Sequence, residues 1–437
     1  MPLNLVLWAL AGTVLASALA LIPALHVYNV AGLVLLLVNA GTLYLAPAAM
    51  AFLFLGMVIG YAMSNTIPSI FLSTPDESMV FIVLPGQTYM RRRRGYEAVV
   101  LAGLGGLGGL VVLAALTPVA PRWLPVLREI LQPHLGWILW TVIAYVLLSE
   151  WPKGTGRAPA GWRRWWDGWK SLTAGLVTFL LSGILGIILM YRPPVPVGVA
   201  YQSFLPAFVG LFAMPWVLVN LLGRTALPRQ HVAGDIDAPL SVIVRGSITG
   251  ALGGLFAALF PVVTGGMGGL LAGHATSQRD SRAFIVSQGA AKIVYYVGGL
   301  LLFFVPGLHL TRGGMAWMVS TRYTAHAPAD YVMALGVSLL CGGFAFLISL
   351  VLARGMARVA RHVDARVISW VTLGILMVVV GMTTGLPGLA VCAVATGIGL
   401  IPVLWGSRRT NAMGVLLLPI ALNMSGAGPW LAGIMGL

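Results

Sequence analysis

GTVLASALALIPALHVYNVAG (Gly12 to Gly32) and GALGGLFAALFPVVTGGMGG (Gly250 to Gly269) are two versions of the pattern that decides the fold. Each is an apolar run rich in small residues that ends at a proline, and a short polar or glycine-rich stretch leads into a second apolar run. Proline lacks a backbone N–H and clashes with the preceding turn, so each stretch predicts a helix that breaks inside an apolar segment. The freed backbone groups cannot face lipid, so protein or a water-filled cavity must satisfy them.

The composition around these stretches is that of a membrane protein. Of the 437 residues, 59% are hydrophobic and 8% are charged, and the mean hydropathy is +0.94. A soluble domain carries about 25% charged residues. The sequence therefore predicts an all-α polytopic membrane protein and excludes a water-soluble domain.

Apolar segments of about 20 residues, the length that spans a bilayer, together with shorter interrupted pieces predict about 10–13 membrane segments. The near-full-length candidates are 3–22, 27–46, 96–118, 135–151, 171–190, 200–222, 284–306, 332–353, 368–382, 384–404 and 411–435. Shorter pieces are 47–64, 65–90 and 242–273, in which Pro47, Pro68, Pro75, Pro85 and Pro261 are expected to break helices.

Basic residues lie mainly in the loops between apolar runs, and the net charge is +15. The loops at 91–95, 152–170 and 354–366 are the richest in Lys and Arg. The positive-inside rule predicts that they are cytoplasmic, Arg91–Arg94 included, and that the uncharged N-terminus lies outside the plasma membrane. Anionic membrane lipids are the expected partners of this charge, and we expect no nucleic acid partner.

A second similarity follows each break: DESMVFIVLPG (Asp76 to Gly86) and DSRAFIVSQG (Asp280 to Gly289). Two similarities in the same order predict an internal repeat, and chance similarity between low-complexity segments is the alternative. The loop charges predict that the repeats enter from opposite faces, which makes them inverted repeats with proline-broken or re-entrant helices. In secondary transporters, such paired breaks mark a substrate site near the midplane of the bilayer.

The repeat divides the chain into four expected parts. They are residues 1–110 (first repeat), 111–241 (connecting spans and a basic, Trp-rich loop), 242–330 (core of the second, inverted repeat) and 331–437 (C-terminal spans). We expect segments 12–100 and 245–306 to superpose, with Pro23 and Pro261 in equivalent breaks.

The breaks are candidate anion sites, because half-helix N-termini present backbone N–H groups and the positive end of a dipole. Lys292 lies in the apolar run GAAKIVYYVGG and is the candidate balancing charge, because an unpaired charge there costs several kcal/mol. The predicted substrate-binding residues are Pro23, Ala24, His26, Asn29, Ser73, Thr74, Pro75, Asp76, Pro261, Thr264, Gly265, Gly266, Ser287, Gln288 and Lys292.

Three of these positions have alternative interpretations. His26 is either a ligand or a hydrogen-bonded core histidine, and Asn29 suits a helix N-cap. Asp76 and its neighbour Glu77 either cap a half-helix or bind a coupling ion or proton.

IPSIFLSTPDESMVFIVLPGQTYMRRRRGYEAV (Ile67 to Val99) resembles the signature of the TctA-type permeases, the large membrane subunit of tripartite tricarboxylate transporters. GTVLASALALIPALH and RGSITGALGGLFAALFPVVTGG are similar to the two breaks of that family. The resemblance implies a secondary-active permease that binds a di- or tricarboxylate between inverted repeats and works by alternating access. It further implies coupling to Na⁺ or H⁺, no other cofactor, and as partners a small membrane subunit and an extracellular binding protein.

The chain departs from the family pattern at both breaks. Pro23-Ala24 and Pro261-Val262 stand where the family has Pro-Gly, and Ser73-Thr74-Pro75-Asp76 stands where it has Asn-Thr-Pro-Gly. These departures are typical of a divergent, archaeal-like branch. They leave open which anion is carried and whether the accessory subunits are used or there are none.

Two other functions were weighed. A translocase (flippase) for an anionic lipid carrier such as polyprenyl phosphate would use the same breaks and arginines. An intramembrane enzyme would need paired acids or His-x-x-Glu spacing within spans, and the sequence has neither, so no enzyme, catalytic residue or metal ligand is predicted. The run GLGGLGGL (Gly103 to Leu110) lacks the Lys-Ser/Thr of a nucleotide-binding loop and is expected to pack helices closely.

Overall fold

The computed structural model describes residues 2–23, 25–74, 77–151, 161–194, 203–223, 229–232, 234–261, 263–278, 280–325, 327–359 and 364–437. Within these ranges the regular structure is all helical. Among the described residues, nine helices are long and apolar enough to cross a membrane, and a bent pair at Arg409–Met424 and Gly428–Ile434 makes a tenth if it is one span. Two shorter apolar helices there are Leu3–Leu19 and Val27–Asn39. The prediction of an all-α polytopic membrane protein is confirmed.

The chain forms two compact units. Unit 1 consists of Met1–Ile130 and Thr225–Ala365, and unit 2 consists of Leu131–Arg224 and Arg366–Leu437. Both proline-broken stretches therefore belong to unit 1, together with every predicted substrate-binding residue that the structure describes.

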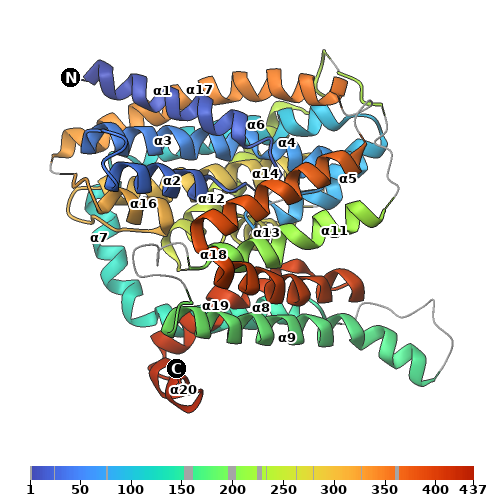
Figure 1. Ribbon diagram of the computed structural model, residues 1–437. Helices are drawn as coiled ribbons and strands as arrows, with labels where there is room; N and C mark the ends of the chain where they lie inside the picture. The colour runs from blue at the N-terminus through green and yellow to red at the C-terminus, as the bar shows by residue number, and fades with distance from the viewer. Residues whose placement is uncertain are drawn as a thin grey trace. The chain divides into compact units, whose positions relative to one another are not determined.

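The first hairpin of unit 1 is α1 (Pro2–Leu19) and α2 (Val27–Asn39), followed by α3 (Pro47–Ser64) and α4 (Thr66–Phe71). α1 and α3 lie side by side and parallel (Figure 1), because Gly56 packs on the Ala9 carbonyl and Gly60 on the Thr13 carbonyl. A Cβ at Gly56 would lie 1.8 Å from the Ala9 oxygen, so only glycine permits this approach.

α3 and α4 together form one span, Pro47–Phe71, with a break only at Asn65. The sequence predicts two separate pieces, 47–64 and 65–90. Residues 65–71 instead continue the first piece as one span, so the prediction is wrong for them. Pro68 does not break the helix because it lies in the first turn of α4, where a missing N–H is tolerated.

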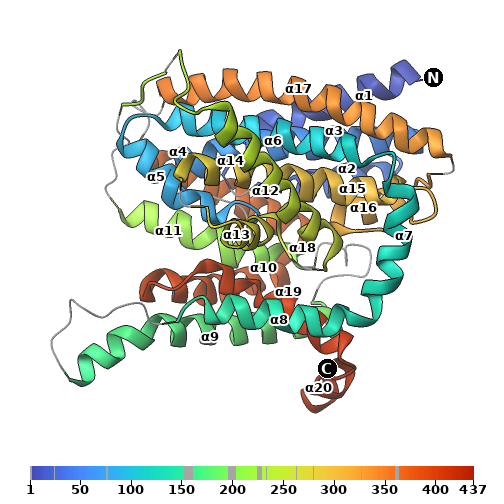
Figure 2. The ribbon, with the colours of Figure 1, turned by 180° about the vertical axis from the view of Figure 1, so that it is seen from behind.

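The second hairpin is α12 (Leu240–Leu259) and α13 (Gly265–Ala275), which run antiparallel (Figure 2). α14 (Ser281–Ile293), the π-helical turn η5 (Val294–Gly298) and α15 (Gly299–Phe304) then continue as one span. α14 runs parallel to α12, with Gly250 against Ser287 and Gly254 against Ala291.

The two hairpins enter unit 1 from opposite ends. α3 runs antiparallel to the α14–α15 span, because Phe52 contacts Phe304 at 6.1 Å between ring centroids and Tyr61 contacts Tyr296 at 6.0 Å. Since α1 is parallel to α3 and α12 is parallel to α14, α1 and α12 point in opposite directions. This is the arrangement expected of an inverted pair, and the superposition of 12–100 on 245–306 stays a prediction.

The second sequence similarity is not a marker of the repeat. Asp280 is the N-cap of α14, the helix that follows the second hairpin directly. The segment after Asp76 instead comes after α3 and α4 and leads through η1 (Val80–Ile82) into α5 (Val83–Arg91). The two segments therefore occupy different places in the order of elements, and that part of the interpretation is wrong.

Two of the loops expected on the cytoplasmic side, 91–95 and the beginning of 354–366, share one end of unit 1. Asp237 lies 3.8 Å from Arg94, which precedes α6 (Gly95–Leu116), and 3.4 Å from Arg282 of α14. Arg354, near the end of α17 (Pro328–Val359), donates to the Tyr96 hydroxyl at 3.2 Å. Which membrane face this end occupies stays a prediction.

The remaining elements of unit 1 are α7 (Ala120–Leu131) and α16 (Gly313–Ser320). The residues between the expected spans 96–118 and 135–151 are thus largely helical.

Unit 2 contains η2 (Gln132–His134), α8 (Leu135–Leu148), α9 (Trp162–Tyr191), α10 (Leu205–Phe208), η4 (Val209–Ala213), α11 (Met214–Leu222), α18 (Ala365–Trp405), η6 (Arg409–Met413), α19 (Gly414–Met424) and α20 (Gly428–Ile434). α9 packs along α19, with Gly186 against Val415. α18 kinks at Gly385 (φ 65°), the boundary expected between two spans.

Candidate functional site

Both breaks reach the middle of the α14–α15 span. That span runs over 24 residues from Ser281 to Phe304. At about 1.5 Å per residue, Lys292 lies about 17 Å from either end. From the second break, a Cβ on Gly265 would lie 3.2 Å from the Cα atom of Lys292. From the first break, the ring of His26 lies 6.0 Å from that of Tyr296, one turn further along the same span.

Lys292 is a fully buried cation at this level, with 0% exposure. Its Nζ donates to Asn65 Oδ1 at 3.1 Å and lies 5.4 Å from the centroid of the Tyr61 ring. A buried charge needs such compensation, and the ring face adds a cation–π contribution. Asn65 lies at the break between α3 and α4, and its side chain reaches Lys292 from that position. The arrangement fixes one positive charge at the level of the breaks.

His26, Glu77 and Tyr296 form a second polar group, which we name the Glu77 cluster. The Tyr296 hydroxyl donates to Glu77 Oε1 at 3.2 Å, and His26 Nε2 lies 3.3 Å from the same oxygen and 2.9 Å from the Tyr296 hydroxyl. His26 Nδ1 accepts the Tyr28 N–H at 3.2 Å, which makes His26 the N-cap of α2. A neutral His26 therefore carries its proton on Nε2, facing Glu77 and Tyr296.

Thr264 joins the second break to the first repeat. As N-cap of α13 its Oγ1 accepts the Met267 N–H at 3.4 Å, and its hydroxyl donates to the Glu77 carbonyl at 3.2 Å. A Cβ on Gly266 would lie 2.8 Å from the Ser78 carbonyl oxygen. The glycine lets the loop at 77–78 rest directly on the first turn of α13.

Gln288 lies on α14 one turn before Lys292 and is fully buried. Neither of its amide atoms has a hydrogen-bond partner within the described part of the chain. Its Nε2 faces α13, 2.8 Å from where a Cβ on Gly269 would stand. An unsatisfied buried amide costs about 1–3 kcal/mol, which indicates a group with a partner in another state of the protein.

Arg312 supports the second break from outside both hairpins. Its Nε donates to the Ala258 carbonyl at 3.0 Å and its Nη2 to the Ala257 carbonyl at 3.3 Å. These carbonyls belong to the last turn of α12, where the helix leaves them without intrahelical partners. The arginine therefore takes the place of the hydrogen bonds that the break at Pro261 removes.

The structure brings six of the predicted substrate-binding residues together: His26, Thr264, Gly265, Gly266, Gln288 and Lys292. Pro23 and Pro261 lie in the turns of the two breaks, and Asn29 is half-buried in the first turn of α2, where His26 and not Asn29 is the cap. Ala24, Pro75 and Asp76 lie outside the described residues.

The other three predicted residues make different contacts. Ser287 donates to the Phe284 carbonyl, and its own carbonyl packs on Gly250 of α12. Ser73 accepts from the Gln87 amide at 3.2 Å, and Thr74 donates to the Pro68 carbonyl at 3.2 Å. Both hydroxyls thus stabilise the turn between α4 and α5.

Sequence reasoning missed Tyr61, Asn65, Tyr296 and Arg312. Tyr296 follows Lys292 by four residues, a spacing that places both on one helix face, so its signal was present. Asn65 is a polar residue within the apolar run MVIGYAMSNTIPS, which is a weaker signal. Arg312 had no local signal, because its partners lie more than fifty residues earlier in the chain.

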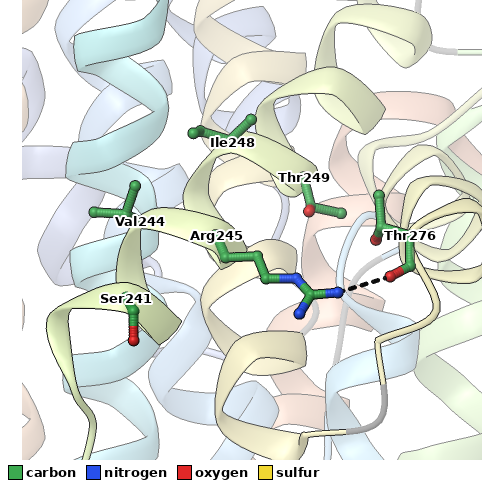
Figure 3. A pocket seen from close by; sticks show the side chains of 6 residues that line it. All are labelled: Ser241, Val244, Arg245, Ile248, Thr249 and Thr276. Atoms are coloured by element: carbon green, nitrogen blue, oxygen red, sulfur yellow. Dashed lines mark hydrogen bonds between the residues drawn. The ribbon is translucent and has the colours of Figure 1, made fainter.

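A surface hollow of about 630 Å³ lies on α12, away from the breaks (Figure 3). It is lined by Ser241, Val244, Arg245, Ile248, Thr249 and Thr276. Arg245 crosses it to donate to the Thr276 carbonyl at 3.1 Å, where a cation suits the C-terminal end of α13. Val244 and Ile248 are exposed apolar side chains, which suits contact with lipid and not with a polar anion.

The comparisons with known proteins cover nearly the whole chain. The family model described as the tripartite tricarboxylate transporter TctA family matches residues 6–414. A protein of Methanocaldococcus jannaschii, described as uncharacterized, is 26% identical over 427 residues, which are 96% of this chain and 98% of that protein. No solved structure matches. The family match spans both hairpins and the polar groups between them.

Proposed function

This chain belongs to the tripartite tricarboxylate transporter TctA family, and from that premise we propose that it carries a di- or tricarboxylate across the membrane through unit 1 by alternating access. The observation that carries the proposal is the meeting of two oppositely directed, broken hairpins beside the buried Lys292. Such a meeting point is where secondary transporters hold their substrate.

The chemistry of the meeting point suits a carboxylate. Lys292 supplies a fixed positive charge, and the first turn of α13, an 11-residue helix, supplies backbone N–H groups and the positive end of its dipole. Gln288 adds an amide whose hydrogen-bonding capacity is unused within the described part of the chain. A carboxylate beside these groups would satisfy the amide and be attracted by the ammonium charge.

Alternating access follows from the opposite directions of the hairpins. Each hairpin closes the path from its own end, so movement of one opens the site to one side while the other keeps it closed. The bonds from Thr264 to the Glu77 carbonyl and from Tyr296 to the Glu77 carboxylate join the two repeats, and one or both must change when a hairpin moves.

The accessory partners follow from the family, whose transporters are tripartite. We propose a small membrane subunit and an extracellular binding protein as partners of this permease. Co-purification of the full chain with a co-expressed small membrane subunit of this transporter family is the direct measurement.

Ligand-dependent thermal stability tests the substrate class. Citrate or succinate should selectively stabilise the purified protein. A ligand that binds only the folded state, at a concentration of 100 times its Kd, raises the free energy of unfolding by about 2.7 kcal/mol. The same assay with polyprenyl phosphate and with neutral sugars provides the comparison. Stabilisation by polyprenyl phosphate alone would replace the carboxylate proposal by a lipid-carrier translocase.

Gln288→Met separates binding from folding. Without ligand, the variant should be more stable than the natural protein by about 1 kcal/mol, because an unsatisfied buried amide is replaced by an apolar group of similar size. Citrate stabilisation should become weaker. Gln278→Met is the matched control, since its amide is also buried and unpartnered within the described residues but lies in the turn after α13. The control should gain stability and keep its response to citrate, and equal responses in both variants would contradict the site.

A further inference from the structure

We propose that the Glu77 carboxylate, held by His26 and Tyr296, is the binding site of the coupling proton. The inference rests on the proposed transport function and names the ion that drives it. No covalent chemistry is involved: the carboxylate takes up one proton to become a carboxylic acid and releases it on the other side.

The contacts of Glu77 are those of a proton site that solvent can reach. Tyr296 O–H and His26 Nε2 both approach one oxygen, Oε1, at 3.2 and 3.3 Å. The side chains of His26 and Glu77 are 18% and 17% exposed, so the site is largely enclosed without being sealed. Ionisable groups that pack against the middle of a span, as these do through Tyr296, are typical of proton relays.

The donor and acceptor pattern favours a proton over Na⁺. Sodium sites in transporters are built from oxygen acceptors, largely unwound backbone carbonyls. Within the described part of the chain, the groups that face Oε1 are an O–H and an N–H donor. The Glu77 carbonyl itself accepts from Thr264. A metal ion would have to displace these donors, whereas a proton only reverses the direction of one hydrogen bond.

Aromatic and charged side chains from α2, α3 and α14 surround the Glu77 cluster. His26 precedes α2 and Tyr28 lies on it, with their rings 4.5 Å apart. Tyr61 of α3 lies 5.0 Å from the His26 ring, and Lys292 Nζ of α14 lies 5.4 Å from the centroid of the Tyr61 ring. Asp76 lies outside the described residues.

This arrangement couples proton and substrate binding. A substrate carboxylate bound at this level repels the ionised Glu77 carboxylate, so its binding makes proton uptake more favourable. Coupling is reciprocal, so a protonated Glu77 favours the bound anion. The two would therefore cross together, as in a symporter.

Protonation also changes the contacts between the repeats. Ionised Glu77 accepts from His26, beside the first break, and from Tyr296, in the α14–α15 span. A protonated carboxyl donates through its O–H, so one of these hydrogen bonds reverses and the Tyr296 or His26 group accepts. The charge state of Glu77 thus sets the direction of the hydrogen bonds between the first hairpin and the span that flanks the second.

Infrared difference spectroscopy of the purified full chain in lipid tests the proton site without a substrate. The natural protein should show the carbonyl stretch of a protonated carboxyl that titrates with pH, and Glu77→Gln should lack it. Tyr296→Phe should move its midpoint to higher pH, because a donor to the ionised form is lost. Glu129→Gln, a change of an exposed carboxylate on α7, is the control and should leave the band unchanged. A band that persists unchanged in Glu77→Gln overturns the proposal.

Proteoliposomes test the coupling. Glu77→Gln should keep exchange of labelled citrate across the membrane while losing citrate accumulation driven by an inward acid gradient. Accumulation equal to that of the natural protein, or accumulation that requires a Na⁺ gradient and ignores pH, overturns the proton as coupling ion. If the natural protein exchanges neither citrate nor succinate, the proposed function fails, and the infrared titration still decides the proton site.

Discussion

Arg94 differs from the three arginines before it in what it contacts. Its Nε and Nη2 donate to the two carboxylate oxygens of Glu97, which is 2% exposed, and this hydrogen bonding raises the pKa of Arg94. Arg91, Arg92 and Arg93 are exposed. Only Arg94 is therefore part of a buried ion pair, and the other three are free to act as an orientation signal.

Arg94→Gln should lower the thermal stability of the purified protein, because Glu97 would keep a buried charge without its partner. Arg92→Gln should leave both the melting temperature and citrate exchange unchanged. Differential scanning fluorimetry of the two variants beside the natural protein makes the comparison. Equal melting temperatures for the two variants would show that the pair contributes no stability.

Lys292 and Glu77 illustrate what single residues reveal in the sequence. Lys292 is recognisable because a cation in an apolar run is costly, and its place in the site followed from that alone. Glu77 was recognisable as an acid that binds a proton or caps a helix, but its partners His26 and Tyr296 lie far away in the chain. Only the fold brings these three together, so the sequence alone could not favour one role over the other.

At the scale of elements, α12 and α13 touch through backbone. A Cβ on Gly268 would lie 2.0 Å from the Gly253 carbonyl oxygen, which belongs to a helix and cannot turn aside. Gly273, a turn and a half further along α13, has room for a methyl group, because the nearest atoms, of Gln278 and Phe284, would lie 3.7 Å away, an ordinary van der Waals distance. Of these two glycines, Gly268 therefore makes the contact that excludes a side chain.

Gly268→Ala should destabilise the protein by about 1–3 kcal/mol and abolish transport, because the added methyl forces the two helices apart. Gly273→Ala, on the same helix, should be neutral or slightly stabilising because alanine favours helix. Thermal unfolding and citrate exchange of both variants decide the matter. A neutral Gly268→Ala would mean that the hairpin is looser than its packing implies.

The proline-broken hairpins were predictable, and the continuity of other elements was not. Pro23 and Pro261 follow long apolar runs, where a proline removes a needed bond. Pro68 has the same chemistry but falls in the first turn of α4, where that bond is absent in any case. The similarity of Asp76–Gly86 and Asp280–Gly289 misled for a related reason: short apolar strings recur in membrane helices regardless of their place in the fold.

At the scale of the whole molecule, the ends of unit 1 predict its orientation. Arg92 lies at the end that holds the basic loops, and Thr311 lies beyond α15 near the other end, both exposed. The two native cysteines, Cys341 and Cys392, are buried and give little background labelling. Arg92→Cys should react with a membrane-impermeant maleimide only from the cytoplasmic side and Thr311→Cys only from outside. Reaction of both from one side would contradict the inverted arrangement.

The π-helical turn η5 has a consequence for comparing relatives of this protein. Lys292 precedes the turn and Tyr296 lies within it, so the wider turn sets the direction of Tyr296 relative to Lys292. An α-helix rotates by about 100° per residue, so loss of one residue here would swing every later side chain of the span around its axis. A relative that lacks one residue of this turn would have a nearly identical sequence. Its counterpart of Tyr296 would no longer reach the counterpart of the Glu77 carboxylate. Given the proposed proton site at Glu77, one small deletion that an identity score barely registers would change the ion dependence between close relatives.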